Sequence, residues 1–213
     1  MAQFLTRFIK LIFGLFLYAL GIVFAIKANI GYAPWEVFHV GLSQTFGISI
    51  GTASITIGAL IVVLVMFLGE KIGIGTILNM FLIGIFLDWI LILNPVPIAS
   101  NFILGVFMLI LGLFTIALGS YFYIDSAFGA GPRDSLMVAL TRITKLPVGV
   151  CRSGVELTVV LIGWKLGGLV GIGTVIAAFG IGFCVQTTFG LLKFDTTKVK
   201  HETLGQSFKL LRS

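Results

Sequence analysis

The sequence repeats one plan twice. Residues 31–36, GYAPWE, return as residues 129–134, GAGPRD, so the two copies are offset by 98 positions. Glycines and one threonine outside this motif recur at the same offset without a gap. A duplication of this length predicts two homologous halves and a site where the halves meet. The matched positions are Gly14, Gly21, Gly51, Gly69, Gly73, Gly75, Thr76 and Gly84 in the first half, and Gly112, Gly119, Gly149, Gly167, Gly171, Gly173, Thr174 and Gly182 in the second.

The composition places these halves in a membrane. Of the 213 residues, 58% are hydrophobic and only 10% are charged. A soluble core cannot enclose so many apolar side chains, so the lipid bilayer must be the solvent for most of them. The net charge of +6 does not indicate a nucleic-acid partner, because lysine and arginine collect near segment ends and in the tail, where they set orientation and meet anionic lipid.

Each half contains three apolar runs long enough to cross a bilayer and one short run. The short runs, residues 35–46 and 132–144, form only about 20 Å of helix, less than the hydrocarbon thickness of about 30 Å. We therefore predict an all-α polytopic membrane protein with two repeats, each of three full spans plus a short broken or re-entrant helix. The first repeat covers 1–93, with spans at 11–28, 49–68 and 73–93; the linker covers 94–101; the second repeat covers 102–192, with spans at 102–124, 148–166 and 172–192; a basic tail covers 193–213.

Whether the short runs cross decides the symmetry. If they do not, the second repeat is inverted relative to the first; if they do, there are four plus four spans and the repeats are parallel. Loop charge favours inversion, because the uncharged linker then lies outside and most basic loop residues lie inside. The same rule predicts that both termini are cytoplasmic. The charges on which this depends are Arg7, Lys10, Lys71, Arg133, Arg142, Lys145, Lys198, Lys200, Lys209 and Arg212 inside, with Lys27 and Lys165 near the outer side.

The repeated motif predicts a helix that starts inside the membrane. Gly31 and Gly129 allow backbone conformations that other residues resist, and Pro34 and Pro132 fit the first turn of a helix. The free N–H groups of such a start need an acceptor.

The acids two residues after each proline suggest two interpretations of these helix starts. Glu36 and Asp134 can cap their own helices locally. Alternatively, the two starts, with Gly131 and Arg133, face one central cavity and hold an anionic or zwitterionic group. Arg133 has no charged counterpart, because the first repeat has Trp35 at that position, so it makes the cavity asymmetric.

The other ionisable residues in apolar segments are costly to place in a membrane and need a reason. Arg152 and Glu156 are one helical turn apart, so they either pair with each other or contact a substrate. Asp88 is matched by Gln186, and it either binds a cation or proton or pairs with an arginine. His39 either packs in the short helix or accepts a proton near neutral pH.

Motifs for other classes of chemistry are absent from the sequence. It contains no phosphate-binding loop, no His/Cys metal pattern and no nucleophile elbow, so we expect neither an enzyme nor a cofactor or metal. Cys151 and Cys184 lie in apolar segments, where they pack as small hydrophobic residues.

Three features of the chain carry a resemblance to a known family: the motif GxxPx-acid after a glycine-rich span, the Gly-Ile-Gly-Thr helix starts, and Arg152 with Glu156 downstream of residues 129–134. In these features the chain resembles the YczE/YitT group of small bacterial membrane proteins. The similarity covers roughly residues 8–192 and is better to the YczE branch than to the YitT branch. It implies a multi-pass protein of the bacterial plasma membrane and carries no substrate or mechanism with it.

These observations favour a secondary transporter of a small polar, anionic or zwitterionic solute, coupled to a proton or cation through Glu36, Asp88 or Asp134. Two alternatives stay open: a non-transporting scaffold or regulator that recruits a partner through its tail, and a channel. The expected partners are lipid and a small-molecule substrate. The sequence leaves the oligomeric state undetermined.

Overall fold

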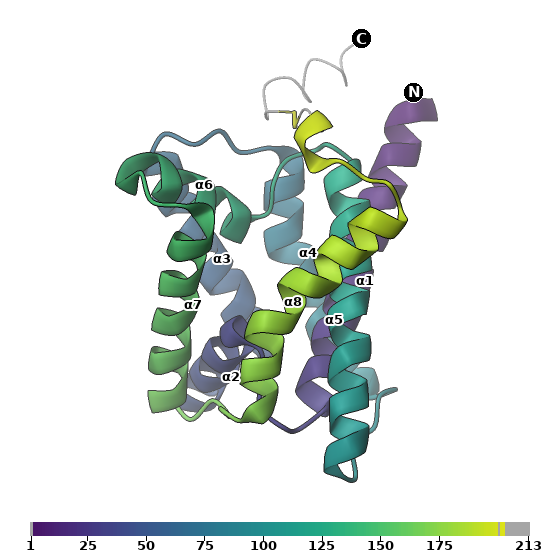
Figure 1. Ribbon diagram of the computed structural model, residues 1–213, viewed down its shortest axis with the longest axis vertical. Coiled ribbons are helices and arrows are strands. Elements are labelled where there is room, and N and C mark those ends of the chain that lie inside the picture. The colour runs from purple at the N-terminus through teal and green to yellow at the C-terminus, as the bar shows by residue number, and fades with distance from the viewer. Residues whose placement is uncertain (1, 200, 203–213) are drawn as a thin grey trace.

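The computed structural model describes residues 2–199 and 201–202, which form a bundle of helices with no β-strand among them (Figure 1). The tail residues Lys200, Lys209 and Arg212, used above for orientation, lie outside the described residues. The elements are α1 (Ala2–Lys27), α2 (Pro34–Phe46), α3 (Ile50–Phe67), α4 (Ile74–Leu93), α5 (Phe102–Asp125), α6 (Pro132–Thr144), α7 (Val148–Lys165), α8 (Ile172–Leu191) and a 3-10 turn, η1 (Thr196–Lys198).

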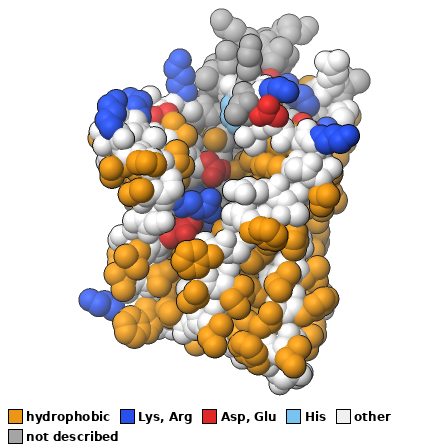
Figure 2. Space-filling view, viewed as in Figure 1, with side chains coloured by type: hydrophobic (Ala, Val, Ile, Leu, Met, Phe, Trp, Pro, Cys, Tyr) orange, Lys and Arg blue, Asp and Glu red, His pale blue; other side chains and the backbone are white. Residues whose placement is uncertain are grey.

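Five of these helices, α1, α3, α4, α5 and α8, are long and apolar enough to cross a membrane. The pair α6 and α7 reaches that standard together but is bent by 117°, which makes it a broken span or a re-entrant loop. Hydrophobic side chains cover much of the outer surface in Figure 2, as expected where lipid replaces water. The prediction of a polytopic all-α membrane protein is confirmed.

The two short helices begin at the predicted prolines. Each is 13 residues long, and the residue before each proline, Ala33 or Gly131, has an extended backbone. An extended residue followed by proline in the first helical turn is a favourable helix start. In Figure 1, α2 lies at the lower end of the bundle and α6 at the upper end, which carries the N-terminus.

The centre of the bundle is the packing of α1 against α5. Glycines allow the two backbones to touch: a Cβ atom added to Gly14 would lie 2.8 Å from the carbonyl oxygen of Gly119, and one added to Gly21 would lie 2.7 Å from that of Gly112. Since residue numbers rise along α1 as they fall along α5, the helices run antiparallel. Leucines around this contact are fully buried.

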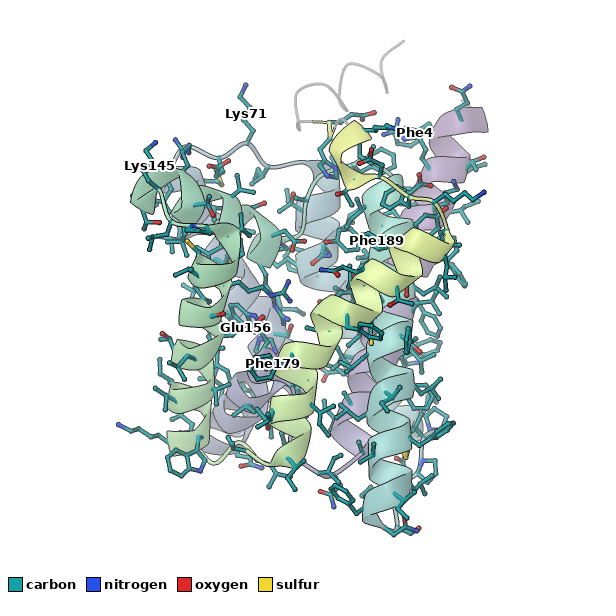
Figure 3. All side chains as sticks on the ribbon, in the orientation of Figure 1. Phe4, Lys71, Lys145, Glu156, Phe179 and Phe189 are labelled. Carbon is teal, nitrogen blue, oxygen red and sulfur yellow. The ribbon has the colours of Figure 1, made fainter. Side chains whose placement is uncertain are left out.

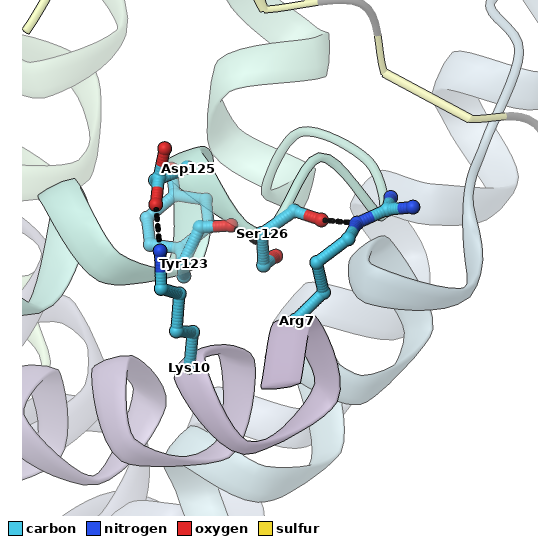
Figure 4. A network of polar contacts seen from close by, with 5 residues as sticks. All are labelled: Arg7, Lys10, Tyr123, Asp125 and Ser126. Atoms are coloured by element: carbon cyan, nitrogen blue, oxygen red, sulfur yellow. Dashed lines mark hydrogen bonds and ion pairs between the residues drawn. The ribbon is translucent and has the colours of Figure 1, made fainter. Parts of the chain in front are cut away.

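Polar contacts tie α1 to the last residue of α5 and to the loop that follows it, at the end that carries the N-terminus (Figure 4). Lys10 Nζ lies 2.7 Å from Asp125 Oδ2, and Arg7 Nε donates to the carbonyl oxygen of Ser126 at 2.9 Å. Arg7 also forms an ion pair of 2.6 Å with Glu202, so the described part of the tail docks at this end.

Candidate functional site

A cavity of about 200 Å³ lies inside the bundle, and all eight α-helices contribute side chains to its wall. Figure 2 shows a hollow in the apolar surface, with acidic and basic side chains at its base. In Figure 3, Glu156 on α7 lies on one side of the opening and Phe189 on α8 lies on the other. The cavity therefore places charged groups between the apolar helices, within reach of the exterior.

Arg133 connects the two repeated helix starts. Its guanidinium carbon lies 4.5 Å from the centre of the Trp35 ring, and its Nη1 lies 3.8 Å from Oε1 of Glu36. Glu36 is only 4% exposed, so Arg133 supplies the positive charge that this buried carboxylate needs. The two copies of the repeated motif thus meet at the cavity. Trp35 and Arg133 occupy equivalent positions in the two copies, and their side chains stack on each other.

Arg152 and Glu156 form the second charged pair. Arg152 Nε donates to Glu156 Oε1 at 2.8 Å, and the arginine side chain is about half exposed whereas the glutamate side chain is 14% exposed. Both line the cavity. The pairing that the four-residue spacing predicted is confirmed, and the exposed face of the guanidinium remains free to contact a solute.

Asp134 has a different kind of partner. It lines the cavity, and its Oδ2 accepts a hydrogen bond from the hydroxyl of Tyr123 on α5. No arginine or lysine lies within ion-pair distance of Asp134 among the described residues. The cavity wall therefore carries two arginines, Arg133 and Arg152, and two carboxylates, those of Asp134 and Glu156, while Glu36 lies outside the wall against Arg133.

His39 also lines the cavity, one helical turn after Trp35. Its ring packs against Trp35 and Phe38, with centroids 6.3 and 6.4 Å apart, and only 2% of the residue is exposed. These contacts match the packing interpretation of this histidine, while its place on the wall keeps it within reach of the charged groups.

Asp88 lies outside the cavity. Its Oδ1 accepts a hydrogen bond of 2.8 Å from the backbone N–H of Gly51, and its Oδ2 accepts one from the hydroxyl of Ser49, the residue that caps α3. Of the two alternatives for Asp88, pairing with an arginine is wrong, because the carboxylate contacts the start of α3 instead. Its two oxygens are satisfied by the free N–H of Gly51 in that helix start and by the Ser49 hydroxyl.

Gly31, Gly129 and Pro34 likewise support the site from outside the cavity wall, whereas Gly131 and Pro132 form part of the wall. Gly31 and Gly129 have φ angles of +113° and +131°, which L-residues rarely adopt. A Cβ atom at Gly31 would also lie 2.6 Å from the nitrogen of Gly171. These glycines hold the loops that aim α2 and α6.

Sequence reasoning missed the neutral polar groups of the wall. Tyr123 carries no signal in the sequence, because its partner Asp134 is reached only when α5 and α6 fold together. The amide of Asn79 lies near Asp134 across Gly131, since both side chains come within 3.5 Å of a Cβ atom placed on that glycine. The neutral polar lining residues are Tyr18, Ser54, Asn79, Ser120 and Tyr123. Among the described residues, no group of three His, Cys, Asp or Glu side chains is placed to hold a metal ion.

Residues 5–189 match the family described as "Family of unknown function (DUF6198)". The chain belongs to this family. It is 38% identical to the uncharacterized membrane protein YczE of Bacillus subtilis over 81% of this chain and 80% of that protein. The resemblance to YczE-type membrane proteins is confirmed.

The chain is also similar to two further proteins. An uncharacterized protein of Haemophilus influenzae is 35% identical over 83% of this chain and 80% of its own length. The uncharacterized protein YyaS of Bacillus subtilis is 25% identical over 76% of this chain and 82% of its own length. No solved structure matches the chain significantly.

Proposed function

We propose that this member of the DUF6198 family is a secondary transporter for a small zwitterionic or anionic solute, which binds in the cavity between two inverted repeats. The observation that carries this proposal is the cluster of Arg133, Asp134, Arg152 and Glu156 in a cavity that all eight helices line. Ionisable groups at membrane depth are costly, and they are tolerated where they face a watered path or a ligand. We expect no enzymatic activity.

Contacts between the halves support inversion. The N–H of Gly75 donates to the carbonyl oxygen of Phe128 at 2.8 Å, and the N–H of Gly173 donates to that of Ile30 at 2.7 Å. These two bonds join positions that match at the 98-residue offset, one at each end of the bundle. A pseudo-twofold axis in the membrane plane relates such a pair of contacts.

Charge supports the orientation. Figure 3 places Lys71 and Lys145 at the end of the bundle that carries the N-terminus. Arg7 and Lys10 lie at the same end, where Glu202 pairs with Arg7. Basic residues on short loops favour the cytoplasm. We therefore place both ends of the chain on the cytoplasmic side of the bacterial plasma membrane.

The charge balance of the cavity supports coupling to a proton or cation. Glu36 faces Arg133 and Glu156 faces Arg152, but the described partner of Asp134 is the neutral Tyr123 hydroxyl. An exposed carboxylate on a cavity wall with no paired cation is free to take up a proton or a bound cation. We therefore assign coupling to Asp134 rather than to Asp88, and the ammonium group of a zwitterionic solute would fit the same place.

The test is reconstitution of the full chain in proteoliposomes with a proton-sensitive dye in the lumen. Zwitterionic and anionic solutes of low mass, such as amino acids and short carboxylates, are added one class at a time under a pH gradient. We expect proton movement that depends on one class and is lost in Asp134→Asn and Arg152→Gln, while Lys165→Gln at the far end of α7 retains it. Ion conductance without solute dependence would instead indicate a channel, and no flux of either kind would favour the scaffold.

A further inference from the structure

Two helix pairs that are equivalent in the repeats pack differently. In the first repeat, α3 and α4 touch at glycines: a Cβ atom added to Gly84 would lie 2.6 Å from the carbonyl oxygen of Gly51. The equivalent positions in the second repeat are Gly182 and Gly149. A Cβ atom added to either of these meets no described heavy atom within 4 Å. The backbones of α7 and α8 are therefore apart where those of α3 and α4 are in contact.

The gap between α7 and α8 is also where the cavity opens. Arg152 and Glu156 of α7 and Val185 and Phe189 of α8 belong to the cavity wall, and Figure 3 shows Glu156 and Phe189 on opposite sides of the opening. The equivalent of Glu156 in the first repeat is Gly58, which contacts α4 directly: its added Cβ atom would lie 3.6 Å from the Cβ atom of Met80. The equivalent helix pairs thus differ: α3 and α4 are in contact in the first repeat, whereas α7 and α8 are apart in the second.

A polar contact holds the closed pair together. Asp88 on α4 accepts hydrogen bonds from the N–H of Gly51 and the hydroxyl of Ser49 at the start of α3. The second repeat retains the acceptor and the small residue, because Gln186 matches Asp88 and Gly149 matches Gly51. The N–H of Gly149 lies in the first turn of α7, where no intrahelical acceptor exists. The side-chain carbonyl of Gln186 is chemically able to accept from it once the helices meet.

We propose that α7 and α8 form the gate of the cavity, and that in a second state they close on each other at Gly149 and Gly182 while α3 and α4 separate at Gly51 and Gly84. The inference rests on the proposed function, since it assigns alternating access to the two inverted repeats. The two states have similar free energies, because the glycine contact and the hydrogen bond that are lost at one helix pair are replaced by equivalent ones at the other pair. Close packing requires small residues, which explains glycines in a pair that does not touch here.

Disulfide trapping in membranes tests the gate without knowledge of the solute. Cys151→Ala and Cys184→Ala first remove the native thiols from the full chain. Gly58→Cys with Met80→Cys then reports the closed α3–α4 pair, because a Cβ separation of 3.6 Å suits a disulfide. Glu156→Cys with Ala178→Cys is the matched pair on α7 and α8. After oxidation, the remaining free thiols are labelled with a thiol-specific mass tag. A chain in which the two cysteines of a pair have formed a disulfide carries neither tag, so the loss of both tags measures the contact.

We expect both pairs to lose their tags, and we expect Gly182→Leu to prevent the loss at the α7–α8 pair without affecting the α3–α4 pair. Leucine is accommodated in the open gap but blocks its closure. Retention of both tags at the α7–α8 pair would overturn the gate, as would a disulfide that joins two copies of the chain, which would show that a second copy covers the opening.

Transport separates this inference from the function on which it rests. In the proteoliposome assay, Gly182→Leu should abolish flux while the folded protein remains in the membrane. If the α7–α8 pair is trapped but no solute moves, the gate stands and the transporter assignment fails. If solute moves unchanged in Gly182→Leu and the pair is never trapped, the transporter assignment stands and the gate fails.

Discussion

The guanidinium of Arg133 lies over the ring of Trp35 and 3.8 Å from the carboxylate of Glu36, so the second repeated motif neutralises the first. Because Glu36 is buried, the contact is a structural requirement as well as a feature of the site.

Removal of Arg133 should therefore destabilise the protein through the charge that it leaves behind. We expect Arg133→Gln to lower the free energy of unfolding by about 3 kcal/mol, the usual cost of breaking a buried pair from one side. Unfolding in detergent micelles, followed by circular dichroism, measures the loss. The double variant Glu36→Gln/Arg133→Gln should regain most of it, and a double variant as unstable as the single one would contradict this explanation.

Tyr123 should matter through its hydroxyl alone. Tyr123→Phe removes the hydrogen bond to Asp134 and should cost about 1 kcal/mol of stability, the usual net contribution of a hydrogen bond, because the exposed Asp134 carboxylate can still be solvated. In Asp134→Asn, the further change Tyr123→Phe should have a smaller effect, since the carboxylate is no longer present. A double-mutant cycle on unfolding measures the coupling, and additive costs would show that the two groups act independently.

The glycine of the repeated motif should tolerate substitution far less than a glycine in open space. Gly31→Ala places a Cβ atom 2.6 Å from the Gly171 nitrogen at a positive φ, whereas Gly47→Ala meets only the positive φ of +66°, with no atom within 4 Å. We expect a loss of about 1 kcal/mol for Gly47→Ala and several times more for Gly31→Ala. Thermal unfolding compares the two, and equal losses would mean that the loop moves to accommodate the methyl group.

Docking of the tail segment at 201–202 should depend on pH. Partial burial lowers the pKa of His201 below its ordinary value near 6.5, and the Asp134 carboxylate only partly opposes this effect. The docked segment thus binds fewer protons than the free segment, so docking is strongest above about pH 6.5 and weakens as the pH falls through the lowered pKa. Amide hydrogen exchange of the Glu202 N–H, which bonds to the Ala127 oxygen, reports docking. His201→Gln should remove the pH dependence and leave the Arg7 to Glu202 ion pair in place.

Local signals in the chain predicted the helices well. Pro34 and Pro132 start the short helices where the sequence places them, because proline in the first turn loses no hydrogen bond. Most apolar runs appear as helices within a few residues of their predicted bounds, but α1 begins at Ala2 instead of residue 11, and α7 has the properties of a span only together with α6. The four-residue spacing of Arg152 and Glu156 also predicted their contact, since neighbours on one helical face need no tertiary information.

The contacts of Asp88 and Asp134 did not follow from local signals. A lone carboxylate in an apolar run predicts that Asp88 binds a cation or proton or pairs with an arginine, yet its partners Ser49 and Gly51 lie at the start of another helix. Tyr123 was overlooked for the same reason. A hydrogen bond between helices depends on their rotation and register, which one helix does not encode.

The sequence by itself determined that this chain is a polytopic membrane protein with matched glycines and helix starts, because bilayer solvation and backbone sterics act on each segment separately. Only the tertiary structure decided which matched contacts are made. Gly51 and Gly149 are the same residue type at equivalent positions of the two repeats, but the first lies against α4 and the second faces open space. That difference comes from how α7 and α8 are placed by the rest of the bundle, and equivalent residues cannot specify it.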